Sequence, residues 1–355
     1  MKSIVFLAPY PTTENIKEGM MQRVAAIDAM FSEAEYKKIY IVPSFKTFGN
    51  SKQEIKDNVV CYHLSMWTEV KKMVSLINNA AIVYCHSLYG ISIVGLWFWK
   101  KIKTTNVIWD VHGIIPEELK FAGMNGFKVK MFAKLERLII YNVPKIVVVT
   151  NAMKYHLEAK YPNCKAAFYT YSILPITIKK EVEIKEKDDE EIVILYSGNV
   201  QKYQNIPLMA QSIAKIIDND KLRFEILTGS PSEMRKIFKQ YGLDRKSNIH
   251  INSVCPSELN AYYKRAHYGY VLRDDIDVNN VACPTKIVEY LAYGLTAIVL
   301  CPNIGDFAEM GYEYIEVDKL ATKQLYPSKS NKNIEIYNQL VEQGDIAKFK
   351  AFIEK

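Results

Sequence analysis

Short runs of β-branched and other apolar residues alternate with helical patterns along this chain, and few folds accommodate such an order. In the first half the runs are Ile4–Ala8, Ile39–Val42, Ala81–Cys85, Val107–Trp109 and Ile146–Thr150, and the helical patterns between them include Met20–Ser32, Thr68–Asn78, Ile91–Lys101 and Lys128–Tyr141. Continuous apolar runs are typical of parallel strands buried on both faces. The order therefore predicts an open α/β sheet.

A charged stretch, residues 179–191, interrupts this order, which then begins again. Beyond it we expect strands at Ile192–Tyr196, Arg223–Leu227, Ile249–Ile251, Tyr268–Leu272 and Ala297–Leu300, and helices at Pro207–Ile217, Ser232–Tyr241, Pro256–Lys264 and Thr285–Tyr293. The length of 355 residues suits two domains. We predict domains at 1–178 and 192–333, a linker at 179–191, and a helical tail at 334–355 that could pack back on the first domain.

Two such domains would be Rossmann-like doubly wound sheets that face a cleft, and ligands would bind at the carboxyl ends of their strands. Neither G-x-G-x-x-G nor G-x-x-x-x-G-K-[ST] occurs, which speaks against nicotinamide-dependent enzymes and P-loop NTPases. The first residues lack the pattern of a secretion signal, and no apolar run approaches the length of a membrane span. We therefore expect a cytoplasmic protein.

Segment 273–294 carries the most chemical information. It reads as a strand end, a polar loop, and a helix that Pro284 opens. The first amides of such a helix can hold a phosphate or diphosphate, and Thr285 and Lys286 would add donors in its first turn. Glu289 lies about one turn further on the same face, where its carboxylate could accept hydrogen bonds from two ribose hydroxyls.

This segment resembles the C-terminal signature of GT-B glycosyltransferases, specifically the retaining family 4 members with a Pro-x-Lys-x-x-Glu motif. The matching positions are Arg273, Asn279, Pro284, Lys286, Glu289, Tyr290, Ala292 and Gly294. The commonest form of the motif has another Glu where this chain has Val281, and the Pro-x-Lys subset shares that difference. The resemblance implies a nucleotide-sugar donor, UDP- or GDP-linked, and transfer without a cofactor or metal. It also implies that strand ends at Gly229 and Val254 hold the nucleobase.

The stretch 196–205, after the first strand of the second domain, is similar to the family's strand-end glycine loop. Gly198 would let the backbone approach a diphosphate next to Asn199, and Lys202 could neutralise its charge. Asn205 stands where the family usually has glycine, a replacement that Asn tolerates because it adopts the left-handed conformation readily.

In the first domain, the strand end at 109–113 resembles the family's Asp-x-His-Gly corner, which faces the transferred sugar. The resemblance implies that His112 bonds a sugar hydroxyl or the leaving phosphate and that Asp110 orients it. His86 and Gly19 match less specific positions on the acceptor or sugar side. The candidate catalytic residues are therefore His112, Asp110, Lys286 and Arg273.

Charge is divided unevenly between the two halves. Up to Pro175 the chain has 22 basic and 13 acidic residues, whereas the remainder has 24 and 26. A basic half attracts an anionic membrane surface or a phosphate-rich ligand. Segment 97–103, Trp-Phe-Trp-Lys-Lys-Ile-Lys, has the composition of an interfacial helix. The alternative is a solvated basic face with the aromatic rings packed in a core. We expect no nucleic-acid partner.

Asp275 and Asp277 form a D-x-D pattern, which holds a metal in GT-A transferases, but its late position favours a solvated loop and we expect no metal.

We expect a glycosyltransferase that moves a sugar from a nucleotide-sugar to a glycan or lipid-linked acceptor, with retention, in cell-surface polysaccharide or glycoconjugate synthesis. It could associate with the inner face of the membrane. The alternatives are a nucleotide-sugar epimerase or hydrolase, and a non-catalytic binding subunit.

Overall fold

The structure is a computed structural model that describes residues 1–17, 19–44, 51–97, 102, 106–172, 178, 191–255 and 258–355. The chain divides into two compact units, here called unit 1 (Met1–Ile173 with Gly344–Lys355) and unit 2 (Leu174–Gln343). Apart from Glu191, the linker predicted at 179–191 lies outside the described residues, as does most of the segment 97–103 that we considered for membrane contact.

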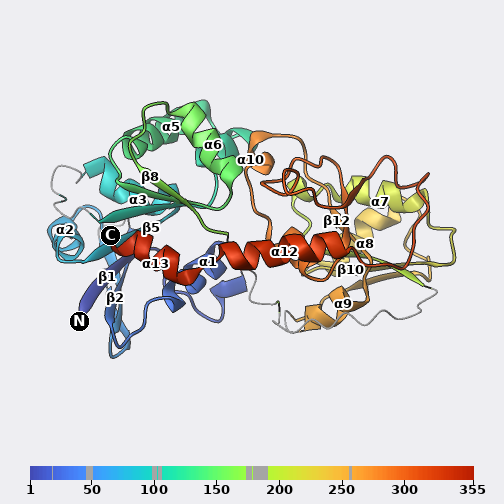
Figure 1. The fold of residues 1–355 in the computed structure, drawn as a ribbon, viewed down its shortest axis with the longest axis horizontal. Helices are drawn as coiled ribbons and strands as arrows, with labels where there is room; N and C mark the ends of the chain where they lie inside the picture. The colour runs from blue at the N-terminus through green and yellow to red at the C-terminus, as the bar shows by residue number, and fades with distance from the viewer. Residues whose placement is uncertain are drawn as a thin grey trace. The chain divides into compact units, whose positions relative to one another are not determined.

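The described part of unit 1 contains an eight-stranded sheet with the order β3-β4-β2-β1-β5-β6-β7-β8 (Figure 1). The strands are β1 Lys2–Leu7, β2 Tyr36–Ser44, β3 Ser51–Lys56, β4 Val59–Ser65, β5 Ile82–His86, β6 Val107–Val111, β7 Lys145–Val148 and β8 Ala167–Thr170. All neighbours pair in parallel except β3 and β4. The strand order reverses between β1 and β5, which makes this the switch point where such sheets bind ligands.

The five strands predicted for the first half are confirmed, with ends shifted by a few residues. Strands β3, β4 and β8 were not predicted. β3 is polar and almost fully exposed along its length, and β8 is only half-buried, so neither has the continuous apolar pattern of a central strand. β3 and β8 are the two edge strands of the sheet, where pairing requires less burial, whereas β4 is mostly buried but has the polar or exposed Tyr62 and His63 within its run.

Helices cover the sheet of unit 1 between its strands. They are α1 Gly19–Ala29, α2 Val70–Asn78, α3 Ser87–Trp97, α4 Ile115–Phe121, α5 Gly126–Ile140 and α6 Asn151–Lys160. The four helices predicted here correspond to α1, α2, α3 and α5. Two were missed, because α4 has only seven residues and α6 buries little besides Met153 and Leu157. Thr150 caps α6 by accepting a hydrogen bond from Met153 N at 3.0 Å.

Unit 2 contains a parallel sheet with the order β11-β10-β9-β12-β13-β14 among its described residues. Its strands are β9 Ile192–Ser197, β10 Leu222–Leu227, β11 Ile249–Asn252, β12 Tyr268–Val271, β13 Thr296–Val299 and β14 Tyr314–Glu316. Its helices are α7 Ile206–Ala214, α8 Pro231–Lys239, α9 Leu259–Arg265, α10 Asp277–Asn280, α11 Thr285–Ala292 and α12 Asn331–Gln343. The strands and helices predicted for this half are present, while β14 and α10, of three and four residues, were too short to predict.

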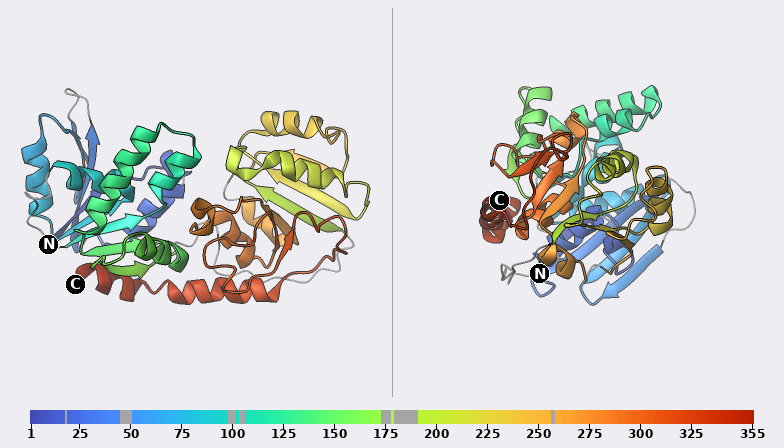
Figure 2. Two further views of the ribbon diagram at one scale, coloured as in Figure 1. Left: turned by 90° about the horizontal axis from the view of Figure 1, so that it is seen from above. Right: turned by 90° about the vertical axis from the view of Figure 1, so that its right-hand side faces the viewer.

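Successive side chains of β9 enter different hydrophobic cores, as the pleat of a strand requires. Ile194 and Tyr196 pack with α7 and α8, whereas Val193 and Leu195 pack with α9, α11 and α12. Figure 2 shows helices on both faces of this sheet. The strand is buried on both sides, which explains its continuous apolar sequence.

The tail predicted as one helix over 334–355 is two helices, α12 and α13 (Ile346–Glu354), with Gly344 between them. Glycine disfavours helix continuation, and Asp345 then caps α13 by accepting hydrogen bonds from Ala347 N and Lys348 N at 2.9 and 3.2 Å. α13 belongs to unit 1, where Phe349 is fully buried. No helix among the described residues is long and apolar enough to cross a bilayer.

We predict that Phe349→Ala destabilises the protein by about 3–5 kcal/mol, because it empties a site of the unit 1 core. Phe349 is fully buried and stacks on Tyr171 with ring centroids 4.1 Å apart. Urea unfolding of the full chain measures the loss, with Lys348→Ala on the exposed side of α13 as the control. A loss below about 1 kcal/mol for Phe349→Ala would show that α13 contributes little to that core.

Candidate functional site

The unit 2 site residues come from neighbouring strand ends at the switch point of its sheet. β9 ends at Ser197 and continues into Gly198, and β12 ends at Val271, two residues before Arg273. Because β9 and β12 are adjacent and parallel, both loops leave the same edge of the sheet. Helix α11 follows the β12 loop and supplies Lys286 and Glu289.

Lys286 lies at the centre of this group. Its side chain is buried, its Nζ donates a hydrogen bond to Gln204 Oε1 at 2.8 Å, and the same atom lies 4.2 Å from the centroid of the Tyr196 ring. Burial lowers the pKa of Lys286 well below its usual range. The Arg273 guanidinium lowers this pKa further, and the Glu289 carboxylate opposes the shift.

Gly198 is required by the close approach of these side chains. A Cβ at this position would lie 2.9 Å from Lys286 Nζ and 3.0 Å from the Tyr196 hydroxyl, and the φ of Gly198 is +156°. The Tyr196 hydroxyl donates to the backbone oxygen of Asn199. Asn205 has a φ of 50°, so this residue does adopt the left-handed conformation that we expected where the family usually has glycine.

Arg273 is half-buried beside Lys286 and contacts neutral groups. Its guanidinium lies 4.5 Å from the centroid of the Tyr203 ring, and Nη1 is 3.3 Å from Asn279 Oδ1. Nε is buried and has no hydrogen-bond partner among the described residues. Asn279 Nδ2 donates to the backbone oxygen of Asp274 at 2.9 Å, so both the oxygen and the nitrogen of the Asn279 amide have hydrogen-bond partners in this loop.

Glu289 is held by a chain of hydroxyl groups. Its Oε2 accepts a hydrogen bond from the Tyr263 hydroxyl at 2.8 Å, which lies 2.9 Å from Ser197 Oγ. Ser197 N donates to the Tyr290 hydroxyl at 3.3 Å. These bonds tie α11 to the end of β9 and orient the carboxylate. Tyr263 and Gln204 were not predicted as site residues, because nothing in their local sequence distinguishes them from other helix or loop positions.

The remaining residues predicted for the donor site are arranged around this group. Lys202 is exposed and begins a 3₁₀ turn, Pro284 precedes α11, and Thr285 is the exposed first residue of α11. Gly229 follows β10 with open space where a Cβ would lie, whereas Val254 packs at the edge of a hydrophobic core. Asp275 and Asp277 are exposed, and Asp275 accepts a hydrogen bond from Asn280 Nδ2 at 2.8 Å.

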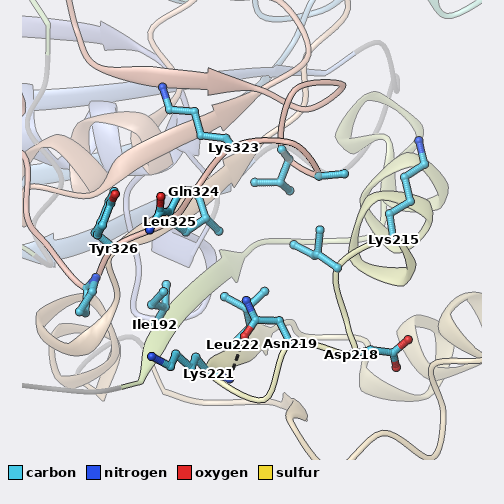
Figure 3. A pocket seen from close by; sticks show the side chains of 14 residues that line it. Ile192, Lys215, Asp218, Asn219, Lys221, Leu222, Lys323, Gln324, Leu325 and Tyr326 are labelled. Carbon is cyan, nitrogen blue, oxygen red and sulfur yellow. Dashed lines mark hydrogen bonds between the residues drawn. The ribbon is translucent and has the colours of Figure 1, made fainter.

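A cavity of about 700 Å³ lies at the opposite edge of the unit 2 sheet. Ile192 and Leu222, which begin β9 and β10, are among its lining residues, together with Lys215, Lys221 and Lys323 (Figure 3). Figure 3 shows that the three ammonium groups point away from one another. The cavity is therefore separate from the predicted donor site, and its lysines do not converge on a single anion.

In unit 1, the ends of β5 and β6 bring three predicted residues together. His86 and Asp110 are paired in the sheet, and His112 follows two residues after Asp110. Asp110 Oδ2 lies 3.3 Å from His86 Nδ1 and 3.1 Å from His112 Nε2, and these two nitrogens are 3.2 Å apart. Gly19 is described as the first residue of α1, while Glu18 lies outside the described residues.

Arg23 completes this group and was not predicted. From α1 its Nε donates to both oxygens of Asp110 at 3.0 and 2.9 Å, its Nη2 donates to Oδ1 at 2.7 Å, and its Nη1 donates to the backbone oxygen of Tyr171 at 2.9 Å. The sequence does contain a signal. Arg23 lies four residues before the buried Ile27 of the same helix, so the helical period places a charged side chain on the core-facing side.

Asp110 is fully buried, and although burial favours its protonated form, Arg23 and His112 hold its pKa well below the usual range. Burial lowers the pKa of His86 to about 4, against the opposing effect of Asp110. At neutral pH the group therefore contains a carboxylate and a neutral His86 ring. Both ring nitrogens that face Asp110 can donate a hydrogen bond to its Oδ2.

His86, Asp110 and His112 also form a group that could hold a metal ion, since one ligand atom from each lies within 4.8 Å of the others. Two observations favour hydrogen bonding instead. The Arg23 guanidinium already neutralises Asp110. The outer nitrogens, His86 Nε2 and His112 Nδ1, are buried without a partner among the described residues, whereas metal-bound histidines usually donate their outer N–H to an acceptor.

We predict that His86 makes stability depend on pH. An unfolded histidine titrates near pH 6.5, whereas folded His86 titrates near 4, so the unfolded chain binds more protons between these values. Stability is then fully present above about pH 6.5 and falls by about 1.4 kcal/mol per pH unit as the pH decreases through this window. Thermal unfolding between about pH 7.5 and 5 measures this slope. His86→Asn should flatten the slope and the exposed control His63→Asn should leave it unchanged; equal slopes in all three proteins would contradict the assignment.

Comparison with known proteins gives a fold but no close relative. No protein-family model matches this sequence, and no curated protein matches it. A sucrose-phosphate synthase from Thermosynechococcus elongatus has a similar structure, with a TM-score of 0.71 and 11% identity over 99% of this chain and 98% of that chain. A UDP-forming α,α-trehalose-phosphate synthase from Burkholderia vietnamiensis has a TM-score of 0.65 and 11% identity, covering 100% and 97%.

A protein from Anabaena solved with UDP and glucose is also similar, with a TM-score of 0.59 and 10% identity over 100% of this chain and 93% of that chain. At this level of identity the likeness shows the fold alone. The chain has the fold of the GT-B glycosyltransferases, as the sequence predicts.

Proposed function

We propose that this protein is a glycosyltransferase of the Pro-x-Lys-x-x-Glu subset of family 4, which moves a sugar from a nucleotide-sugar to a glycan or lipid-linked acceptor with retention. Unit 2 binds the donor and unit 1 contributes groups to the sugar and acceptor. The UDP-forming synthase and the protein solved with UDP and glucose, both similar in fold, support a UDP-linked donor over a GDP-linked one. We propose that the enzyme acts in cell-surface polysaccharide or glycoconjugate synthesis, at the inner face of the membrane.

The observation that carries this proposal is the pair of cations at the switch point of unit 2. The charge of Arg273 lowers the pKa of Lys286, and the hydrogen bonds of the two side chains go to the neutral amides of Gln204 and Asn279. Burial disfavours the charged form of both groups, and the carboxylates of Glu289 and Asp274 only partly offset this effect; a bound anion would favour the charged forms further. A diphosphate on this edge, next to Gly198 and the first amides of α11, supplies that anion.

The chemistry then consists of positioning and leaving-group stabilisation. As the bond between sugar and phosphate breaks, negative charge grows on the nucleoside diphosphate, and Lys286, Arg273 and Lys202 stabilise it. Glu289, oriented by Tyr263, accepts hydrogen bonds from the ribose hydroxyls. His112 bonds a sugar hydroxyl or the leaving phosphate, held in place by Asp110. Retention without an enzyme nucleophile implies attack by the acceptor on the same face, and this arrangement uses no metal.

We predict that a UDP-linked sugar raises the thermal unfolding temperature of the wild-type protein in the presence of EDTA. At about 100 times its dissociation constant the donor adds about 2.7 kcal/mol, a rise of a few degrees. UDP-, GDP-, ADP- and CMP-linked sugars form the panel. Lys286→Ala and Glu289→Ala should abolish the shift, and Lys332→Ala, on an exposed helix position, should retain it. A full shift in both site variants would overturn the site assignment, and a shift that needs Mg²⁺ would point to Asp275 and Asp277.

The products separate the proposed activity from its alternatives. Transfer of radiolabelled sugar to an added acceptor supports a transferase, whereas release of free sugar or of an epimer alone supports a hydrolase or epimerase. Donor binding without any turnover, across a panel of acceptors, would favour a binding subunit.

We also predict that donor binding takes up protons and weakens as the pH rises. Burial lowers the pKa of Lys286 in the free protein, and a bound diphosphate raises it again because it favours the ammonium form. Titration calorimetry in two buffers of different ionisation enthalpy measures this uptake. Lys286→Arg, which stays protonated, should remove most of it; unchanged proton uptake in that variant would assign the proton to another group.

A further inference from the structure

The connection between α4 and α5 exposes an unusual number of large apolar side chains. Phe121, Met124, Phe127 and Met131 have exposed fractions of 41%, 41%, 77% and 44%, all within eleven residues of sequence. Single exposed apolar residues are common on protein surfaces, but a contiguous group marks an interaction surface. We call residues 120–131 the hairpin tip.

The exposed apolar side chains of α5 are not residues that failed to pack in the core, because α5 has a separate buried face. Phe132, Leu135 and Ile139 point into unit 1, whereas Phe127, Met131 and Leu138 follow the helical period on the exposed side. Figure 1 shows α5 on the outside of unit 1. The helix is therefore apolar on two faces, and the structure of unit 1 accounts for one of them.

The same stretch carries a net positive charge. Between residues 119 and 135 the sequence has no aspartate or glutamate and four lysines, at positions 120, 128, 130 and 134. Among the described residues, none of these lysines forms an ion pair. Lysine is depleted in protein–protein interfaces, whereas lysine beside phenylalanine and methionine is what a helix at an anionic membrane surface uses. The positive charge of the hairpin tip therefore favours an anionic bilayer surface as its binding partner.

The base of the hairpin is fixed, so the tip is presented in a defined way. Lys160 on α6 bonds to Glu117 of α4 at 2.5 Å and to Glu136 of α5 at 2.6 Å, which cross-links the three helices. Asn125 caps α5 by accepting a hydrogen bond from Phe127 N at 2.9 Å. A rigid base lets apolar side chains enter the interface without first ordering a loop.

The hairpin tip is also close to the unit 1 site along the chain. α4 begins at Ile115, three residues after His112, and its seven residues rise by about 10 Å before the tip begins. Building on the lipid-linked acceptor proposed above, we propose that the hairpin tip docks unit 1 on anionic bilayers, with Phe121, Met124, Phe127 and Met131 in the interface and the lysines at lipid phosphates.

The test is sedimentation of the full chain with vesicles in the absence of donor and acceptor, so its result is independent of glycosyl transfer. We expect binding to phosphatidylcholine vesicles that contain phosphatidylglycerol and much less to phosphatidylcholine alone, with binding reduced by salt. Phe121→Ser with Phe127→Ser, and separately Lys128→Glu with Lys130→Glu, should each lower the bound fraction at least about fivefold at limiting lipid. Circular dichroism and cooperative thermal unfolding, compared with the wild type, report whether these variants are folded.

Two control variants match the chemical changes. Trp67→Ser removes an exposed aromatic side chain elsewhere in unit 1, and Lys323→Glu with Lys332→Glu reverses the same amount of charge in unit 2. Both should bind vesicles within about twofold of the wild type. Equal binding to both vesicle types, or equal losses in the controls, would overturn the proposal. A dimer that Phe121→Ser with Phe127→Ser dissociates, without vesicle binding by the wild type, would assign the surface to a second copy of this chain.

Discussion

The parallel pairing of β-strands is the constraint on which both sites depend. Parallel neighbours end at the same edge of a sheet, so residues that follow different strands are brought together without direct links in sequence. In unit 1 this places His86 beside Asp110 from the next strand. In unit 2 it places Gly198, after β9, beside the loop that contains Arg273, after β12. In both units the strand order reverses at or next to this point, where the flanking loops diverge and leave room for a ligand.

Buried charge is treated differently in the two units. In unit 1 the positive charge of Arg23 is matched by the Asp110 carboxylate, and four of its hydrogen bonds are satisfied within the chain. In unit 2 the side chains of Lys286 and Arg273 donate hydrogen bonds to side-chain amides, and Arg273 Nε has no hydrogen-bond partner among the described residues. The first arrangement fixes a geometry by itself, and the second is the one to which we propose that a diphosphate binds.

The sequence predicted what depends on local pattern and missed what depends on distant contacts. Buried central strands such as β9 have an apolar run that distinguishes them, and Pro284, Lys286 and Glu289 stand at fixed spacing on one helix. Edge strands such as β3 have no such pattern, because one side of their backbone and most of their side chains face solvent. Arg23 is 87 residues from Asp110, and Gln204 is 82 residues from Lys286, so only the folded chain shows these pairs.

The C-terminal helix has a consequence for how the molecule is made. Unit 1 consists of the first 173 residues together with α13, and α13 follows all of unit 2 in the chain. Phe349 and Ile353 of α13 fill the same core as β1 and β2. The chain is synthesised from its N-terminus, so all residues of unit 2 are made before the last residues of unit 1. Unit 2 can therefore complete its hydrophobic core before unit 1 does. Unit 1 stays open on one side until the ribosome has added α13, and an interrupted translation product would contain a finished unit 2 beside an unfinished unit 1.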